Sequence, residues 1–147
     1  NLTDILYWIS REPEFGRQAV YLEDAESAAQ LPDAAELKRL RDQGVRIWAP
    51  PLFALLALDQ RGQIVPSQSA LDARAAGLEL VAWSLERSGP LGVGRNGWYY
   101  QTVDSALRSD SDVLVVLDVL ARQAHVRAVF SDWPATTTFY ANCTGLD

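Results

Sequence analysis

Short apolar runs alternate along the chain with segments whose apolar residues recur at helical spacing. The runs have the length of buried strands and are bounded by glycine, proline or charged residues: 18–24, 45–49, 78–83 and 126–130. The helical patterns follow them: 34–43, 52–58, 68–76, 113–123 and 135–142. A further short helix is expected before residue 16, with Thr3 or Asp4 as its cap. Strands that alternate with helices indicate right-handed crossovers and a parallel sheet.

Two α/β architectures fit this order of elements. Four βα units are half of an eight-stranded TIM-type (β/α)8 barrel, which typically needs about 250 residues. An open doubly wound sheet of four or five strands is the structural alternative, because it fits the 147 residues of this chain.

The segment 78–90 shows where chemistry is expected. Its apolar strand leads into a polar cluster, and Glu86 and Arg87 come just before the stiff turn Gly89-Pro90. Asp132 likewise comes after the last strand and before Pro134. Ligands bind at the carboxyl ends of parallel strands, where acids suit a divalent cation and arginine suits a phosphate. For Glu86, Arg87 and Asp132 we therefore favour a functional role.

The other strand ends and the glycine-rich loop give weaker signals. The first strand ends in Glu23-Asp24, and for Asp24 we favour helix capping. The loop 89–97 has four glycines but does not lie between a strand and a helix as a phosphate loop does, so we expect a rim or lid. For the aromatic residues 98–100 after it, a cleft wall and the core are equally good interpretations.

Composition excludes several classes of function. The net charge of −6 argues against nucleic-acid or anionic-membrane partners, and no apolar run approaches the length of a membrane span. A single cysteine, Cys143, and a single histidine, His125, exclude a cysteine-based metal cluster or a histidine pair within this chain. Asn1-Leu2-Thr3 and Asn142-Cys143-Thr144 match the N-glycosylation pattern, which is common by chance.

Two segments resemble the glycerophosphodiester phosphodiesterase family. Residues 73–87, with Gly77-Leu78 before a strand that ends at Trp83, resemble the family's Gly-Leu strand. Residues 126–136 resemble its closing strand, which ends in Phe, Ser or Thr, Asp, Phe or Trp, and Pro. The match is good over 65–146, and before residue 65 only the order of elements agrees.

The resemblance implies an eight-stranded α/β barrel that hydrolyses glycerophosphodiesters to glycerol 3-phosphate and an alcohol. It also implies a divalent cation, calcium or magnesium, and a pair of histidines as general acid and base. The family's His-Arg-Gly motif, its Glu-x-Asp pair and its second histidine have no counterpart here, so no catalytic residue and no main metal ligand is expected in this chain. Many relatives carry arginine one place before Arg87, where this chain has Glu86. The implied substrate-binding residues are Trp83, Glu86, Arg87, Trp98, Tyr99, Tyr100, Asp132 and Trp133.

We therefore interpret residues 1–147 as a single segment, the C-terminal half of the barrel. We expect it to be inactive until joined by an N-terminal half, from the same protein or another chain. The alternatives are a non-catalytic α/β module that binds a polyol or sugar phosphate, and a pair of such halves forming a dimer. Many relatives are exported, which favours a periplasmic or extracellular location with Cys143 in a disulfide; a buried, reduced Cys143 fits equally well and leaves the cytoplasm open.

Overall fold

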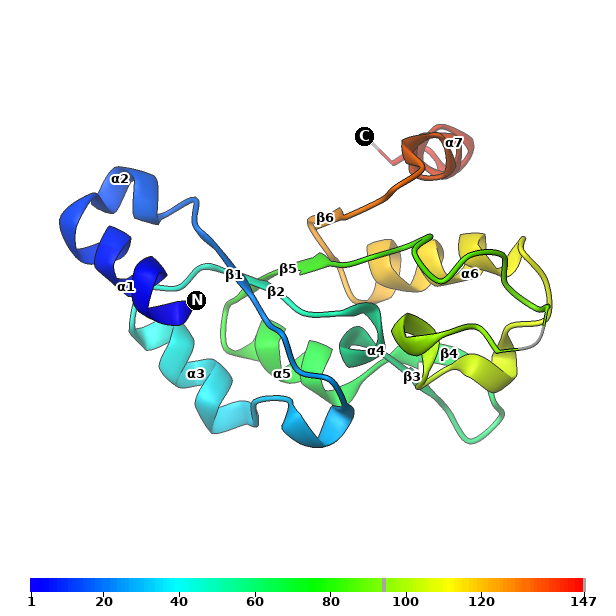
Figure 1. The fold of residues 1–147 in the computed structure, drawn as a ribbon, viewed down its shortest axis with the longest axis horizontal. Helices are drawn as coiled ribbons and strands as arrows, with labels where there is room; N and C mark the ends of the chain where they lie inside the picture. Colours follow the sequence, from blue (N-terminus) through cyan, green and yellow to red (C-terminus); the bar gives the residue numbers. More distant parts are fainter. Residues whose placement is uncertain (94, 147) are drawn as a thin grey trace.

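Four parallel strands form the main sheet of the structure, a computed structural model that describes residues 1–93 and 95–146. They are β1 (Val20–Leu22), β2 (Ile47–Ala49), β5 (Glu79–Ala82) and β6 (Ala128–Val129), and they lie in the order β1-β2-β5-β6 (Figure 1). Leu22 pairs with Ala49, and Val81 pairs with Ala128. The predicted α/β fold with a four-stranded parallel sheet is confirmed.

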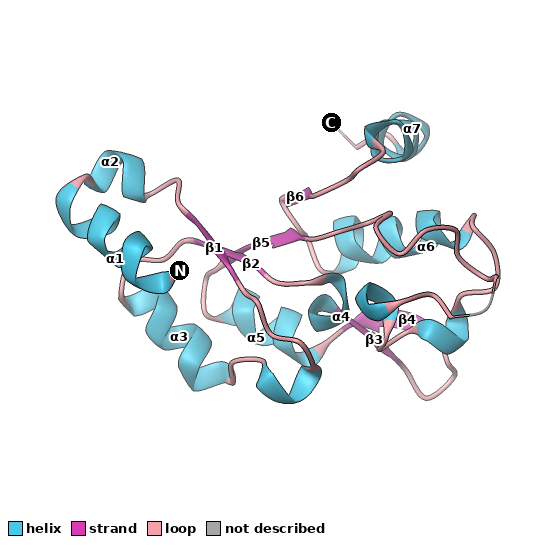
Figure 2. Ribbon diagram, viewed as in Figure 1, coloured by secondary structure: helices cyan, strands magenta, loops and turns pink. Residues whose placement is uncertain are grey.

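One face of this sheet packs against the helices. The helices are α3 (Ala34–Asp42), α4 (Leu52–Leu55), α5 (Gln68–Ala75), α6 (Asp112–Asp118) with its continuation η4 (Val119–Gln123), and α7 (Pro134–Thr144). Figure 2 shows α3, α4 and α5 on one side of the strands. Trp48 and Leu80 point from the strands into the main core, and the buried apolar residues of α3, α5, α6 and α7 all join the same core.

The opposite face of the sheet is apolar, buried at its central strands and exposed at the outer strand β1. Because side chains alternate along a strand, Ile47, Ala49 and Val81 point away from the helices, and they form a separate small cluster with Trp83. On the outer strand β1, Val20 and Leu22 are 40% and 49% exposed. A doubly wound sheet would carry helices here, so the described residues do not support that alternative.

Two elements differ from the sequence-based expectation. The first helix, α1 (Leu2–Arg11), is capped by Asn1, whose side chain accepts from the Thr3 amide, and not by Thr3 or Asp4. The short α2 (Pro13–Gly16) follows it. The segment 52–58 is helical only over α4, and it continues as β3 (Leu56–Leu58), which forms an antiparallel hairpin with β4 (Ile64–Pro66).

Short 3-10 turns complete the connections: η1 (Ala28–Gln30), η2 (Trp98–Tyr100) and η3 (Asp104–Ala106). Within the described part of the chain, none of the helices is both long enough and apolar enough to cross a membrane.

Candidate functional site

The ends of β5 and β6 are joined by a bidentate ion pair between Arg87 and Asp132. Arg87 Nε donates to Asp132 Oδ2 at 3.0 Å, and Nη2 donates to Oδ1 at 2.8 Å. The structure therefore brings these two predicted site residues together, from strands that are neighbours in the sheet. Both side chains remain about half exposed.

Glu86 also binds the turn that follows β6, through its carboxylate. Its carboxylate accepts from Ser131 Oγ at 2.8 and 2.9 Å, from the Asp132 amide at 2.9 Å and from the Trp133 amide at 3.4 Å. The backbone adds a further link, because the Leu85 amide donates to the Phe130 carbonyl at 3.0 Å. The loops after β5 and β6 therefore form one hydrogen-bonded unit.

The ion pair fixes the charge state of its two partners. The hydrogen bond from Arg87 lowers the pKa of the Asp132 carboxyl, and the hydrogen bond to Asp132 raises the pKa of Arg87. The pair is therefore fully ionised and carries no net charge at neutral pH. A guanidinium has five N–H donors, and two go to Asp132, which leaves the others for an anionic ligand.

Three of the predicted aromatic residues lie together beside this unit. The ring centroids of Trp83 and Trp98 are 5.9 Å apart, those of Trp83 and Tyr99 5.7 Å, and those of Trp98 and Tyr99 4.9 Å. Trp83 Nε1 donates to the Ala49 carbonyl at 2.9 Å, which ties the cluster to the end of β2. Trp98 Nε1 donates to the Glu26 carbonyl at 2.8 Å, which ties it to the segment after β1.

Tyr100 does not join that cluster, although it is next to Tyr99 in sequence. Its side chain is completely buried, and its hydroxyl donates to the Leu85 carbonyl. Burial is the main reason that its pKa is raised well above the usual range, with the charges of Glu86 and Asp110 adding to the effect. Residues 98–100 were expected to form either a cleft wall or part of the core, and for Tyr100 the core is correct.

A cavity of about 580 Å³ lies between the loop after β5 and helices α6 and α7. Glu86 and Trp133 line it, and the buried Tyr100 forms part of its floor. Asp110, which the sequence did not single out, also lines it and accepts from the Leu91 amide at 3.0 Å. No strand ends near Asp110 in the sequence, so no pattern pointed to it.

A second carboxylate that we did not assign to the site is Glu23, at the end of β1. It is 8% exposed, and the Trp48 indole donates to it at 3.4 Å. Its charge and that of Asp24 add to burial, the largest effect, in raising the pKa of Tyr21. The sequence signal that could have identified Glu23 was its place in a pair of carboxylates directly after an apolar strand.

The described residues do not provide a complete metal centre. Within 1–93 and 95–146, no three or more histidine, cysteine, aspartate or glutamate side chains are arranged to hold a metal ion. Cys143 is exposed and unbridged, so the expectation of a buried cysteine is wrong.

Comparisons with known proteins give one relative with an uninformative name. No family model matches the chain. A protein of Arthroderma benhamiae, described as "Extracellular protein", is 41% identical over 152 residues, which cover 99% of this chain and 61% of the relative. The chain therefore spans about three fifths of the length of the curated relative it matches. Of the predicted locations, periplasmic, extracellular or cytoplasmic, the comparison confirms the extracellular one.

Proposed function

We propose that the chain is the C-terminal half of a glycerophosphodiester phosphodiesterase of the TIM-barrel type. The observation that carries this proposal is the unit formed by Glu86, Arg87 and Asp132. Residues from two segments that resemble the family, 45 positions apart, lie within hydrogen-bond distance at the carboxyl ends of neighbouring parallel strands. In a barrel that edge of the sheet is where substrates bind.

The arrangement of layers supports a half barrel. In a complete barrel the helices surround the sheet and the inner face is filled by apolar side chains. Here the helices pack on one face, and Ile47, Ala49 and Val81 lie on the other. If 152 residues are 61% of the relative, its length is about 250 residues, the typical size of a complete barrel. Further strands would also pair with the open edges of β1 and β6.

In this proposal the residues of the chain bind and orient the substrate. The free N–H donors of Arg87 would contact the phosphate, and Asp132 would hold the guanidinium plane in position. Trp83, Trp98 and Tyr99 would pack against the glycerol carbons. Trp133, which is 68% exposed, would lie at the rim of the cleft.

The divalent cation and the histidine pair that the resemblance implies do not fit the described residues. No metal-binding group of three ligands is present among them, and His125 precedes β6, at the amino end of that strand. In the proposal the ligands of the cation and the histidines belong to the N-terminal half.

The test is product release by the full-length protein. We expect glycerol 3-phosphate to appear, by phosphorus NMR, when the protein is given glycerophosphodiesters with calcium or magnesium. Arg87→Met should lower kcat/KM by roughly tenfold or more, because a charge-assisted hydrogen bond to phosphate contributes about 1.5–3 kcal/mol. Arg39→Met is the matched control, since Arg39 forms an exposed ion pair with Glu36 on helix α3. The absence of glycerol 3-phosphate with every substrate would contradict the proposal.

The aromatic cluster favours one alternative, a non-catalytic module that binds a polyol or sugar phosphate. Aromatic rings that pack edge to face, as Trp98 and Tyr99 do, can lie against the apolar faces of such ligands, and Arg87 is already neutralised by Asp132. This alternative predicts that glycerol 3-phosphate binds to the full-length protein, as measured by calorimetry, while no glycerophosphodiester is consumed.

A further inference from the structure

The C-terminal helix α7 presents a glycosylation pattern on its solvent-facing side. Asn142-Cys143-Thr144 has asparagine, a residue other than proline, and threonine, which is the acceptor pattern for N-linked glycans. The proposed phosphodiesterase activity does not involve these residues, so they need a separate explanation.

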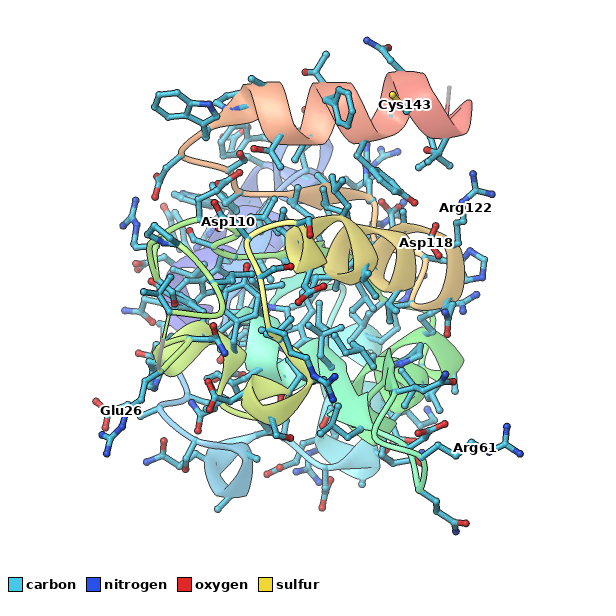
Figure 3. All side chains as sticks on the ribbon, turned by 90° about the vertical axis from the view of Figure 1, so that its right-hand side faces the viewer. Glu26, Arg61, Asp110, Asp118, Arg122 and Cys143 are labelled. Carbon is cyan, nitrogen blue, oxygen red and sulfur yellow. The ribbon has the colours of Figure 1, made fainter. Side chains whose placement is uncertain are left out.

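The side of α7 that packs on the protein is defined by Tyr140. Tyr140 is 6% exposed, and its hydroxyl donates to Asp118 Oδ1 at 2.9 Å. Arg122 Nη2 donates to the Thr144 carbonyl at 2.7 Å and attaches the end of the helix to η4. Figure 3 shows α7 lying above Asp118 and Arg122.

Asn142 points away from that packed side. Two residues along an α-helix correspond to a rotation of about 200°, so Asn142 lies nearly opposite Tyr140. Ala135 and Thr138 lie on the same side as Asn142, and all three are exposed. A bulky, hydrated group on Asn142 would therefore extend into solvent without displacing any side chain of the core.

The extracellular location supplies the second condition, because N-glycans are added to proteins that enter the secretory pathway. We infer that Asn142 is an N-glycosylation site of this protein. The donor is an oligosaccharide linked through pyrophosphate to a lipid. The Asn142 amide nitrogen forms a bond to C1 of the first sugar, the bond from C1 to the pyrophosphate oxygen breaks, and the lipid pyrophosphate leaves with that electron pair while the amide loses a proton.

The fold indicates when this transfer takes place. In the finished helix Thr144 Oγ1 donates to the Tyr140 carbonyl at 2.8 Å, so the threonine hydroxyl is engaged. Recognition of both Asn142 and Thr144 therefore precedes the folding of α7. The helix can form afterwards because the glycan lies on its outer side.

The experiment is site-resolved mass spectrometry of the full-length protein secreted from a eukaryotic host. Enzymatic release of N-glycans should convert Asn142 to aspartate in the wild-type peptide. Asn142→Gln and Thr144→Ala should each lose the mass of one glycan, whereas Thr144→Ser should keep it because serine preserves the pattern. Asn1→Gln removes the other matching site, so any glycan on Asn1 can be distinguished from one on Asn142.

An unmodified Asn142 in the secreted wild-type protein would overturn the inference. If a variant is not secreted, the wild-type peptide alone decides the question. The result does not depend on whether the protein hydrolyses phosphodiesters, so the two proposals succeed or fail separately.

Discussion

Arg87 binds the carboxylate of Asp132 through two hydrogen bonds, at 3.0 and 2.8 Å, although the residues are 45 positions apart. The pair connects the loop that follows β5 to the loop that follows β6, the next strand in the sheet. Because these contacts join the two loops, a substitution in one loop should alter the other.

Replacing Arg87 should change how Asp132 titrates. The hydrogen bond from Arg87 lowers the pKa of Asp132, so the pair stabilises the fold above the usual aspartate pKa of about 3.9. That contribution is lost as pH falls through the lowered, folded-state pKa. Arg87→Gln should raise the Asp132 pKa toward its ordinary value in a carbon NMR titration. An unchanged Asp132 titration in this variant, compared with Arg122→Gln as control, would rule out the ion pair in solution.

Replacing Glu86 should loosen the turn after β6. One carboxylate oxygen of Glu86 accepts from Ser131 Oγ and the other accepts from the Asp132 amide. Glu86→Gln replaces one of these oxygens with an NH2 group, which cannot accept. Losing hydrogen bonds to a charged group should cost about 1–3 kcal/mol. Hydrogen exchange at the Asp132 amide should become faster. Glu14→Gln is the control, because Glu14 forms an exposed ion pair that contributes about 0–1 kcal/mol; equal effects of the two changes would contradict this role for Glu86.

Gly92 should be far less tolerant of alanine than Gly62. Both have positive φ angles, 76° and 74°, which cost an alanine about 1–2 kcal/mol. A methyl group on Gly92 would also collide with the backbone of Arg108 and Ser109, whereas nothing lies within 4 Å at Gly62. We expect Gly92→Ala to lower the unfolding free energy by roughly 1–3 kcal/mol more than Gly62→Ala, measured by urea denaturation. Similar losses would show that the loop at Gly92 is not packed as described.

Tyr100→Phe should destabilise the protein and change its response to alkaline pH. The variant leaves the buried Leu85 carbonyl without its donor, at a cost of about 1–2 kcal/mol. Burial raises the pKa of Tyr100, so its contribution is complete below the usual tyrosine pKa of about 10 and declines as pH rises through the folded value. Thermal unfolding against pH should show a smaller alkaline loss in Tyr100→Phe than in wild type. An equal alkaline loss in the two proteins would contradict this role for Tyr100.

The elements with local signals were predictable from sequence. The helix that begins after Asp33 was expected over 34–43 and is observed over 34–42, and a capping box between Asp33 and Glu36 holds its start at 2.8 and 3.0 Å. The β3–β4 hairpin was missed because an unbroken apolar run such as 52–58 has no period that separates helix from strand. Asp59, which accepts from the amides of Arg61 and Gln63 at 2.8 Å, was the turn signal between its strands.

The site was predictable only to the level of strand ends. Glu86 and Asp132 were expected to lie close together because both follow parallel strands, and the structure brings them together. That Arg87 pairs with Asp132 was not predictable, since sequence spacing does not tell which opposite charges meet. Tyr99 and Tyr100 are neighbours in one short turn. The burial of Tyr100 depends on tertiary packing, which the local sequence does not show.

We propose that residues 1–147 form four of the eight βα units of a barrel. The most direct measurement is hydroxyl-radical footprinting of Leu22 and Phe130, which are 49% and 52% exposed in this chain. The account predicts that both are protected in the full-length protein and labelled in the isolated chain, because further strands would cover them. Equal labelling of both residues in the two samples would contradict it.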